Sequence, residues 1–239
     1  KKLEKPKQKW GGFGWVCLVG NISLMAFYTV VCGWLINYFV KFVSGNNQNM
    51  GFDKMTADPS VNVLFLLVTV VVSFFILSFN LQGGLERVTK YMMIALLVLM
   101  VVLAVNSLML GGAGEGMTFY LKPDFSKING SVVVGAMNQA FFTLSTGMGG
   151  MAIFGSYIDK NRSLMGEAVS VISLDTLVAI LAGVIIFPAC FTYNLEVNAG
   201  PSLLFDTMAT VFNNMEGGRI WGSLFFLFMV FAGMSTVLG

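Results

Sequence analysis

The side chains best suited to bind an ion or a small polar molecule lie in one apolar stretch, residues 131–158. Its polar residues and glycines gather near the middle: Gln139, Thr143, Ser145, Thr146, Gly147, Gly149 and Gly150. Glycine costs roughly 1 kcal/mol relative to alanine inside a helix, so we expect a helix to break there. Within a membrane, freed backbone groups are tolerated only where protein covers them or where they line a cavity. The stretch therefore predicts a binding site built from oxygen atoms, with close helix packing at small residues as the alternative.

Asp175 is the second candidate, because it is the one acidic side chain well inside an apolar stretch, residues 169–187. An ionised Asp near the centre of a bilayer costs about 2.5 to 3.5 kcal/mol on insertion scales, so it is expected to face a partner inside the protein. The apolar stretches hold no Lys or Arg at that depth, which leaves a bound cation as a natural partner. The alternative is an Asp close enough to the membrane surface to be hydrated.

Several kinds of chemistry are excluded by the residues that the chain lacks. It has no histidine, which removes serine–histidine dyads, histidine proton relays and most zinc sites. An aspartyl protease within the membrane needs two carboxylates, and Asp175 alone qualifies. Cys17, Cys32 and Cys190 show no paired or metal-like spacing and are expected to be buried thiols. We therefore predict that the protein is not an enzyme.

The amino-acid composition indicates that membrane-spanning helices must hold these candidate residues in place. Of 239 residues, 56% are hydrophobic and 11% are charged, whereas a soluble domain carries roughly 25% charged residues. Residues 61–79 and 91–110 contain no charge, and about 20 such residues cross a bilayer core as a helix. The basic residues lie between these runs rather than on one face, which argues against a nucleic-acid partner. The chain is therefore predicted to be an all-α membrane protein.

We predict six membrane-spanning helices, at residues 14–43, 61–79, 91–110, 131–158, 169–187 and 220–239. Glycines break the fourth, and Pro188 is expected to end the fifth. Residues 189–219 form a long connection that could hold short helices lying over the mouth of the protein. The chain begins without Met, and residues 225–239 are still membrane-like, so we expect both ends to lie within a longer protein.

The basic residues also predict an orientation. Nine of the 14 Lys and Arg residues lie on one side of the predicted spans, in residues 1–9, 87–90 and 160–162. Because cytoplasmic loops carry an excess of Lys and Arg, that side is expected to be cytoplasmic. The connection 189–219 is then extracellular, in a multi-pass protein of the cell membrane.

Three stretches resemble the neurotransmitter:sodium symporter family, in its bacterial amino-acid-transporting branch. The most specific is the pattern Gln-x-Phe-Phe-Thr-Leu-Ser-x-Gly-x-Gly at residues 139–149. Residues 84–88 (Gly-Leu-Glu-Arg-Val) and 119–125 (Phe-Tyr-Leu-Lys-Pro-Asp-Phe) support it. The resemblance covers nearly the whole chain and implies part of a LeuT-type inverted-repeat helical bundle with one unwound helix. The six spans then resemble the third to the eighth of the family.

The resemblance implies sodium-coupled symport of apolar amino acids across the plasma membrane by alternating access. Sodium ions would be the coupling ions, with no other cofactor. The expected partners are an amino-acid substrate, sodium, membrane lipid and the remaining spans of the same transporter. The alternative is a membrane scaffold or receptor that retains the transporter fold without transporting.

The resemblance also assigns residues to the substrate. The expected set is Leu24, Tyr28, Val31, Phe142, Ser145 and Met148. Tyr28 matches the family tyrosine whose hydroxyl bonds the substrate carboxylate, and the others line the side-chain pocket. Met148 stands where some relatives have an aromatic ring, and its flexible thioether would admit larger or more varied apolar side chains.

Two sodium sites are implied in the same way. Thr143 and Asp175 match ligands of the first ion, and the second matches Ala232, Ser235 and Thr236. Oxygen-only ligation suits a hard cation. Asp175 stands where many relatives have Asn, and animal members bind chloride beside the first sodium ion. Asp175 could supply that negative charge, with Gln139 at the position that resembles the chloride site.

Overall fold

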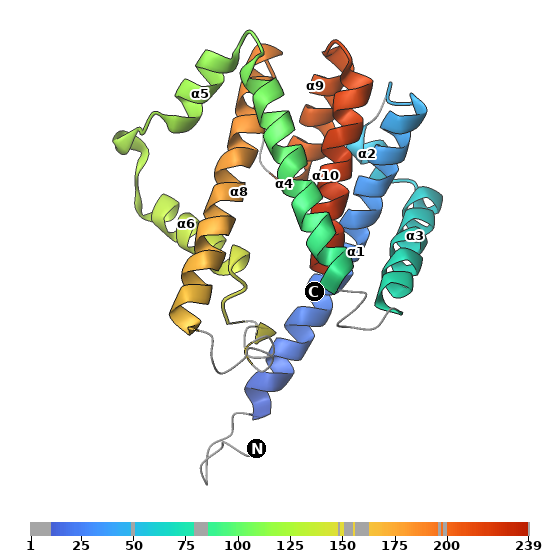
Figure 1. Ribbon diagram of the computed structural model, residues 1–239, viewed down its shortest axis with the longest axis vertical. Helices are drawn as coiled ribbons and strands as arrows, with labels where there is room; N and C mark the ends of the chain where they lie inside the picture. The colour runs from blue at the N-terminus through green and yellow to red at the C-terminus, as the bar shows by residue number, and fades with distance from the viewer. Residues whose placement is uncertain are drawn as a thin grey trace. The chain divides into compact units, whose positions relative to one another are not determined.

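Apolar helices make up nearly all of the described chain. The computed structural model describes residues 11–48, 51–78, 86–147, 149–150, 155, 163–195, 197 and 200–238, and these contain no strand. The elements are α1 (Gly11–Ser44), α2 (Phe52–Thr56), α3 (Pro59–Leu77), α4 (Glu86–Leu108), α5 (Ala113–Leu121), η2 (Phe125–Lys127), α6 (Gly130–Thr143), α8 (Leu164–Thr192), η3 (Leu203–Thr207), α9 (Met208–Asn214) and α10 (Gly218–Leu238) (Figure 1). The short element η2 is a 3-10 helix and η3 is a π-helix.

Five of these helices are long and apolar enough to cross a membrane: α1, α3, α4, α8 and α10. They overlap five of the six spans that the sequence predicts. The other predicted span, 131–158, begins with α6, which ends at Thr143. Residues 148, 151–154 and 156–158 of that span lie outside the described residues.

Pro188 does not end α8, although the sequence led us to expect a helix end there. The helix continues through it to Thr192. A proline removes one helix hydrogen bond and crowds the preceding turn, but here α5 packs directly against it. A Cβ atom added to Gly116 of α5 would lie 2.6 Å from the Cα of Pro188. We attribute the continuation to this packing of α5 against the turn that contains Pro188.

The chain divides into two compact units, each described by itself. The first joins Lys1–Ala26 to Pro123–Val178, and the second joins Phe27–Lys122 to Ala179–Gly239. Helices α1 and α8 each contribute to both units.

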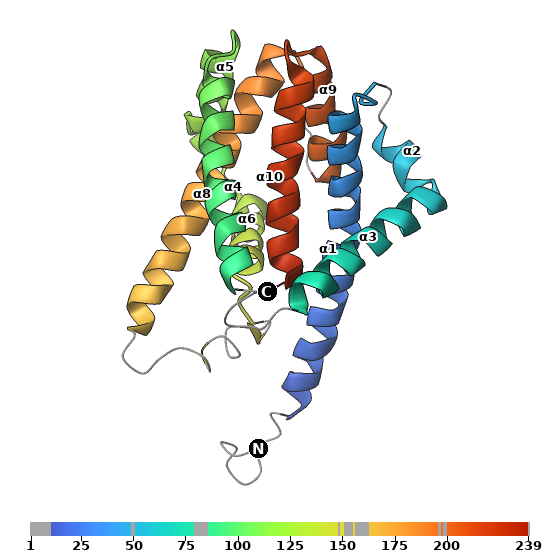
Figure 2. The same cartoon turned by 45° about the vertical axis from the view of Figure 1, so that its right-hand side comes forward.

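The second unit is organised around α10, which lies between α4 and the C-terminal half of α1 (Figure 2). Phe42 of α1 stacks on Phe226 of α10 at 5.3 Å between ring centroids, and both rings are fully buried. Gly222 makes the close approach possible, because a Cβ atom there would lie 2.4 Å from the Phe42 ring. Small residues at such crossings let membrane helices come together.

Polar side chains fix the segment between α1 and α3. The indole N–H of Trp34 donates to Oδ1 of Asn62 at 2.7 Å. The amide of Asn62 in turn donates to the carbonyls of Met55 and Thr56, at 3.2 and 2.9 Å, where α2 ends. The side chain of Asp58 caps α3 by accepting from backbone N–H groups in its first turn. Together these bonds satisfy backbone groups that would otherwise lack partners.

In the first unit, a capped connection leads into α6. Asp124 accepts hydrogen bonds from the hydroxyl and the backbone N–H of Ser126 at 2.5 and 3.1 Å, and these lower the pKa of its carboxyl below the usual value. Asn129 then caps α6 by accepting from the N–H of Val132 at 3.0 Å. The start of the helix that carries the predicted site is therefore set by local sequence.

Candidate functional site

Helix α6 ends at Thr143 in a Schellman motif, where the sequence predicts a break. The N–H of Thr146 donates to the carbonyl of Phe141 at 3.0 Å, and the N–H of Ser145 donates to the carbonyl of Phe142 at 3.1 Å. This pair of bonds defines the motif, in which the first residue after the helix C-cap has a left-handed backbone conformation. That residue is Ser145, with φ of 50°.

The backbone after α6 stays in conformations that favour glycine. Gly147 and Gly149 have φ of 85° and 79°, which side chains disfavour and glycine adopts freely. Ser145 is the exception, because it holds a left-handed conformation with a side chain and therefore carries some strain.

Two predicted ligands of one ion meet within the first unit. The hydroxyl of Thr143, the last residue of α6, donates to Oδ1 of Asp175 in α8 at 2.9 Å. Asp175 is half-buried, with no basic side chain paired to it among the described residues. The pair brings a hydroxyl oxygen and a carboxylate within reach of a common cation, beside the point where the backbone leaves its helix.

Cys17 of α1 also contacts the break, which the sequence did not suggest. Its thiol donates a weak hydrogen bond to the carbonyl of Gly147 at 3.7 Å. A Cβ atom on Gly149 would lie 3.3 Å from the Sγ of Cys17. Of the three cysteines expected to be buried, Cys32 and Cys190 are buried and Cys17 is half-buried. No spacing rule could have paired residues this far apart in sequence.

The other predicted residues of the first unit have different environments. Leu24 is half-buried, whereas Gln139 is exposed and Phe142 is 50% exposed. Met148 lies outside the described residues. The structure therefore brings Thr143 and Asp175 into contact and leaves Gln139 and Phe142 on the surface of this unit.

Tyr28 and Val31 belong to the second unit, on the part of α1 that faces α10. Both are half-buried. Tyr28 packs against a buried cluster of Cys32, Met234 and Val237. Its hydroxyl has no hydrogen bond to another residue of the described chain. The ring is thus held by packing against this cluster.

The three residues predicted for the second ion lie within one turn of α10. The hydroxyls of Ser235 and Thr236 both donate to the carbonyl of Ala232, at 2.8 and 3.1 Å. Back-bonding of this kind is common for Ser and Thr in membrane helices. These hydrogen bonds bring together three neutral oxygens, the carbonyl of Ala232 and the hydroxyls of Ser235 and Thr236. Rotation of the two hydroxyls would direct their lone pairs at a cation.

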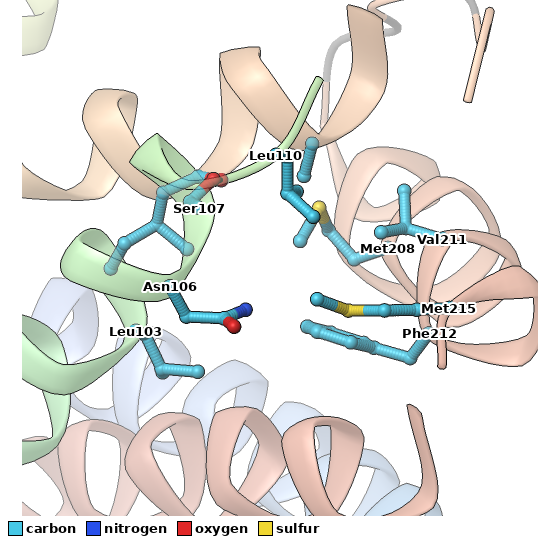
Figure 3. Close-up of a pocket in the computed structure, with 10 residues that line it drawn as sticks. Leu103, Asn106, Ser107, Leu110, Met208, Val211, Phe212 and Met215 are labelled. Atoms are coloured by element: carbon cyan, nitrogen blue, oxygen red, sulfur yellow. Dashed lines mark hydrogen bonds between the residues drawn. The ribbon is translucent and has the colours of Figure 1, made fainter. Parts of the chain in front are cut away.

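A small cavity in the second unit is lined by none of the predicted site residues. It lies between α4, α8 and α9 and is about large enough for one water molecule. The amide of Asn106 points across it toward Met215 and Phe212 (Figure 3). Ser107, also on its wall, donates to the carbonyl of Ile185 at 2.7 Å. The cavity is too small for an amino acid.

Comparison with known proteins decides the family. A family model described as the sodium:neurotransmitter symporter family matches residues 46–239. The chain belongs to this family. Family members are transporters and not enzymes, and five apolar helices agree with a multi-pass membrane protein. The predicted family is therefore confirmed.

Bacterial relatives support the same assignment. An uncharacterized sodium-dependent transporter of Haemophilus influenzae is 34% identical over 250 residues, covering 99% of this chain and 55% of that protein. The uncharacterized sodium-dependent transporter YhdH of Bacillus subtilis is 31% identical, covering 98% of this chain and 54% of that protein. The chain spans about half the length of these relatives.

A solved structure extends the likeness to the fold. The crystal structure of MhsT in complex with L-phenylalanine matches with a TM-score of 0.85 and 34% identity, over 98% of this chain and 55% of that one. The predicted fold class, a helical membrane bundle of this family with one broken helix, is confirmed.

Proposed function

We propose that the full-length protein is a sodium-coupled symporter of apolar L-amino acids that works by alternating access. The observation that carries the proposal is the hydrogen bond between Thr143 and Asp175, 2.9 Å long, at the end of a broken helix. A hydroxyl and a carboxylate at such a break form an oxygen-rich site for a hard cation within an otherwise apolar protein.

Thr143 and Asp175 are proposed ligands of the first sodium ion. The carboxylate supplies a full negative charge close to the ion, and the Thr143 hydroxyl keeps one carboxylate oxygen in place. Asp175 would also replace the chloride that animal members bind, so that transport is independent of chloride. Gln139 is proposed for the position that resembles the chloride site of the family.

Ala232, Ser235 and Thr236 are the proposed second sodium site. Their oxygens are neutral, and all three belong to a single turn of α10. Sodium bound there would replace the internal hydrogen bonds of the two hydroxyls. The oxygens that the described chain offers to this site therefore all come from α10.

For the substrate we propose the residues that the resemblance to the family implies. Tyr28 is placed at the amino-acid carboxylate, since its hydroxyl has no partner among the described residues and its ring is held by packing. The side-chain pocket is assigned to Leu24, Val31, Phe142, Ser145 and Met148. MhsT is seen in complex with L-phenylalanine, which supports an apolar substrate here. The Met148 thioether would allow more than one apolar side chain to fit.

The remaining spans of the same transporter are proposed to complete the first unit. Helix α6 has no buried residue, although Val133, Val134 and Met137 on it are large and apolar. In the whole protein we expect further helices, and lipid at the outer surface, to cover these side chains. We place the connection 189–219 on the extracellular side, in agreement with the distribution of basic residues.

The proposal is tested by uptake of L-phenylalanine into proteoliposomes that contain the full-length protein. We expect uptake with an inward sodium gradient and almost none when choline replaces sodium. Liposomes without protein provide the background. Uptake that is the same in sodium and in choline would refute the proposed function, as would an absence of uptake for every apolar amino acid tested.

A further inference from the structure

One turn of α10 presents two different faces. Successive residues are about 100° apart around a helix, so the oxygens proposed for the second sodium ion lie on one face, from Ala232, Ser235 and Thr236. The opposite face carries the side chains of Met234 and Val237, which are 3% and 7% exposed. The width of a single helix therefore separates a proposed ion site from a buried contact.

The buried face of this turn packs against the helix that carries Tyr28. Met234 and Val237 form a buried cluster with Cys32 of α1, and Tyr28, one turn before Cys32, packs against that cluster. A Cβ atom on Gly233 would lie 3.4 Å from the Sγ of Cys32, which is ordinary van der Waals contact. Little more than a methyl group therefore fits between the backbone of α10 and α1, so a shift of this turn changes the packing on α1.

Helix α3 supports α1 beside this cluster. A Cβ atom on Gly33 would lie 3.1 Å from the carbonyl carbon of Phe65, so the two helices are in close contact there. Ile76 of α3 packs against the same cluster. Cys32 is fully buried, whereas Tyr28 is half-buried. A movement of α10 at this turn is therefore expected to displace the Tyr28 ring rather than Cys32.

The hydroxyls of Ser235 and Thr236 allow this turn two arrangements. Both donate to the carbonyl of Ala232, at 2.8 and 3.1 Å, and back-bonding of this kind often bends a helix. Sodium held by the three oxygens would replace these hydrogen bonds and change the bend. Because the opposite face of the turn is packed, such a change alters the position of Met234 and Val237.

We propose that sodium bound on one face of α10 positions Tyr28 through Met234 and Val237 on the opposite face. Met234 and Val237 are then positioning residues that act through Tyr28 and not as ligands. This coupling rests on the proposed function, because it joins the second sodium site to the residue placed at the substrate carboxylate. Coupling between two binding sites is reciprocal, so substrate should raise sodium affinity at this site by the factor by which sodium there raises substrate affinity.

The first test measures binding of L-phenylalanine and of radioactive sodium to the full-length protein. For Met234→Ala we expect affinity for L-phenylalanine at saturating sodium to fall about fivefold, at the lower end of coupling between sites. Sodium affinity measured without substrate should stay within about twofold, because the oxygens of the site are intact. Met234→Leu keeps the volume of the side chain and should restore the affinity for L-phenylalanine.

Met100→Ala is the matched control for the loss of a buried methionine. Met100 lies in α4, is fully buried and does not belong to the cluster. Its replacement should lower the unfolding midpoint, as Met234→Ala does, and leave affinity for L-phenylalanine within about twofold. A loss of less than about twofold for Met234→Ala, or an equal loss for Met100→Ala, would overturn the proposal.

Double variants separate this coupling from the first sodium site, with L-phenylalanine binding measured at a limiting sodium concentration. Met234→Ala combined with Ser235→Ala should lose little more affinity than the more affected single variant, because both changes interrupt the same coupling. Met234→Ala combined with Asp175→Asn should lose the product of the two single effects. Losses that multiply in both pairs would show that Met234 does not act through the second site.

The response of Tyr28 to sodium can be followed without substrate and without transport. Fluorotyrosine is inserted in place of Tyr28, and its fluorine NMR signal is recorded in sodium and in choline. We expect sodium to shift the signal, Ser235→Ala to raise the sodium concentration needed by about two- to tenfold, and Met234→Ala to reduce the shift by about half or more.

This signal distinguishes failure of the coupling from failure of the proposed function. A signal that sodium leaves unchanged, in a protein whose unfolding midpoint sodium raises, would overturn the coupling and leave sodium symport in place. A sodium-dependent shift that requires Met234, in a protein that takes up no apolar amino acid, would support the coupling and refute symport.

Discussion

The two proposed ion sites differ in how the chain builds them. In the first unit, Thr143 and Asp175 come from different helices, and a hydroxyl meets a carboxylate where α6 ends. In the second unit, Ser235 and Thr236 share the carbonyl of Ala232 within one turn of α10. The residues proposed for the first site are brought together by tertiary structure and include a charge, whereas those proposed for the second lie on one helix and are neutral.

This difference has a physical consequence for ion binding. A carboxylate near a cation in a low-dielectric interior contributes far more than a neutral oxygen does. A neutral site within one helix costs less to keep in a membrane, because both hydroxyls donate to the carbonyl of Ala232 when the ion is absent. We therefore expect changes at the first site to alter anion dependence as well as sodium affinity, and changes at the second to alter sodium affinity alone.

The largest expected effect is on substrate affinity and comes from a residue outside both proposed ion sites. It tests whether anion dependence changes only when an ion site is altered. Tyr28→Phe removes a hydrogen bond to a charged carboxylate, worth roughly 1.5 to 3 kcal/mol, so substrate affinity should fall about 10- to 150-fold. The dependence on anions should not change. Substrate binding is measured by scintillation proximity at saturating sodium, with thermal unfolding as the control. A change of less than about threefold would mean that Tyr28 only packs.

Asp175→Asn should weaken sodium binding by at least about tenfold, the equivalent of 1.4 kcal/mol. The change keeps the shape and one oxygen but removes the charge near the ion. Thr143→Val is the matched variant, because it removes the hydrogen bond to Asp175 and leaves the charge in place. We expect its loss of sodium affinity to be smaller than that of Asp175→Asn. A larger loss of sodium affinity in Thr143→Val than in Asp175→Asn would show that the charge of Asp175 is not what distinguishes the first site.

Ser235→Ala should weaken sodium binding by about two- to tenfold, the range for one neutral oxygen ligand. No anion effect is expected. Ser223→Ala is a close control, since Ser223 also lies in α10 and donates to a carbonyl one turn earlier, that of Arg219, at 2.7 Å. The sodium concentration for half-maximal uptake is compared for the two variants. If this sodium concentration rises equally in both variants, Ser235 is not a ligand of the second ion.

The smallest effect is expected for Ser145→Gly, and it concerns stability. Because Ser145 has φ of 50°, glycine should relieve strain, and thermal stability should be unchanged or raised by about 1 kcal/mol or less. Ser170→Gly, at an exposed position inside α8, should instead lower stability by about 0.5 kcal/mol. Unfolding midpoints of the two variants are measured in detergent. A clear loss of stability for Ser145→Gly would argue against strain at the break.

Local features of the fold could be predicted from the sequence. The glycines after Thr143 predicted the break, because glycine signals backbone that a helix does not adopt. The long apolar stretches predicted helices, because a chain segment in lipid must satisfy its own backbone hydrogen bonds and a helix does so. Pro188 misled that prediction, since the packing of Gly116 against it is a tertiary contact that no local pattern contains.

Most contacts between residues far apart in the chain could not be predicted from the sequence. The position of Thr143 and Asp175 at one ion came from resemblance to the family, and their hydrogen bond required a structure. Nothing in the spacing of Cys17 indicated its contact with Gly147. The hydrogen bond between the side chains of Asn47 and Asn213 had no signal either, because the two residues lie 166 positions apart in the sequence.

The most direct test of the account measures sodium-dependent uptake of L-phenylalanine with two different anions. Full-length wild type and Asp175→Asn are each titrated with sodium, once as chloride and once as gluconate. We predict that the wild-type curves coincide in the two anions, that Asp175→Asn needs more sodium in gluconate, and that chloride restores part of its activity. Identical sodium curves for the two proteins, in both anions, would contradict the claim that Asp175 provides the charge of the first ion site.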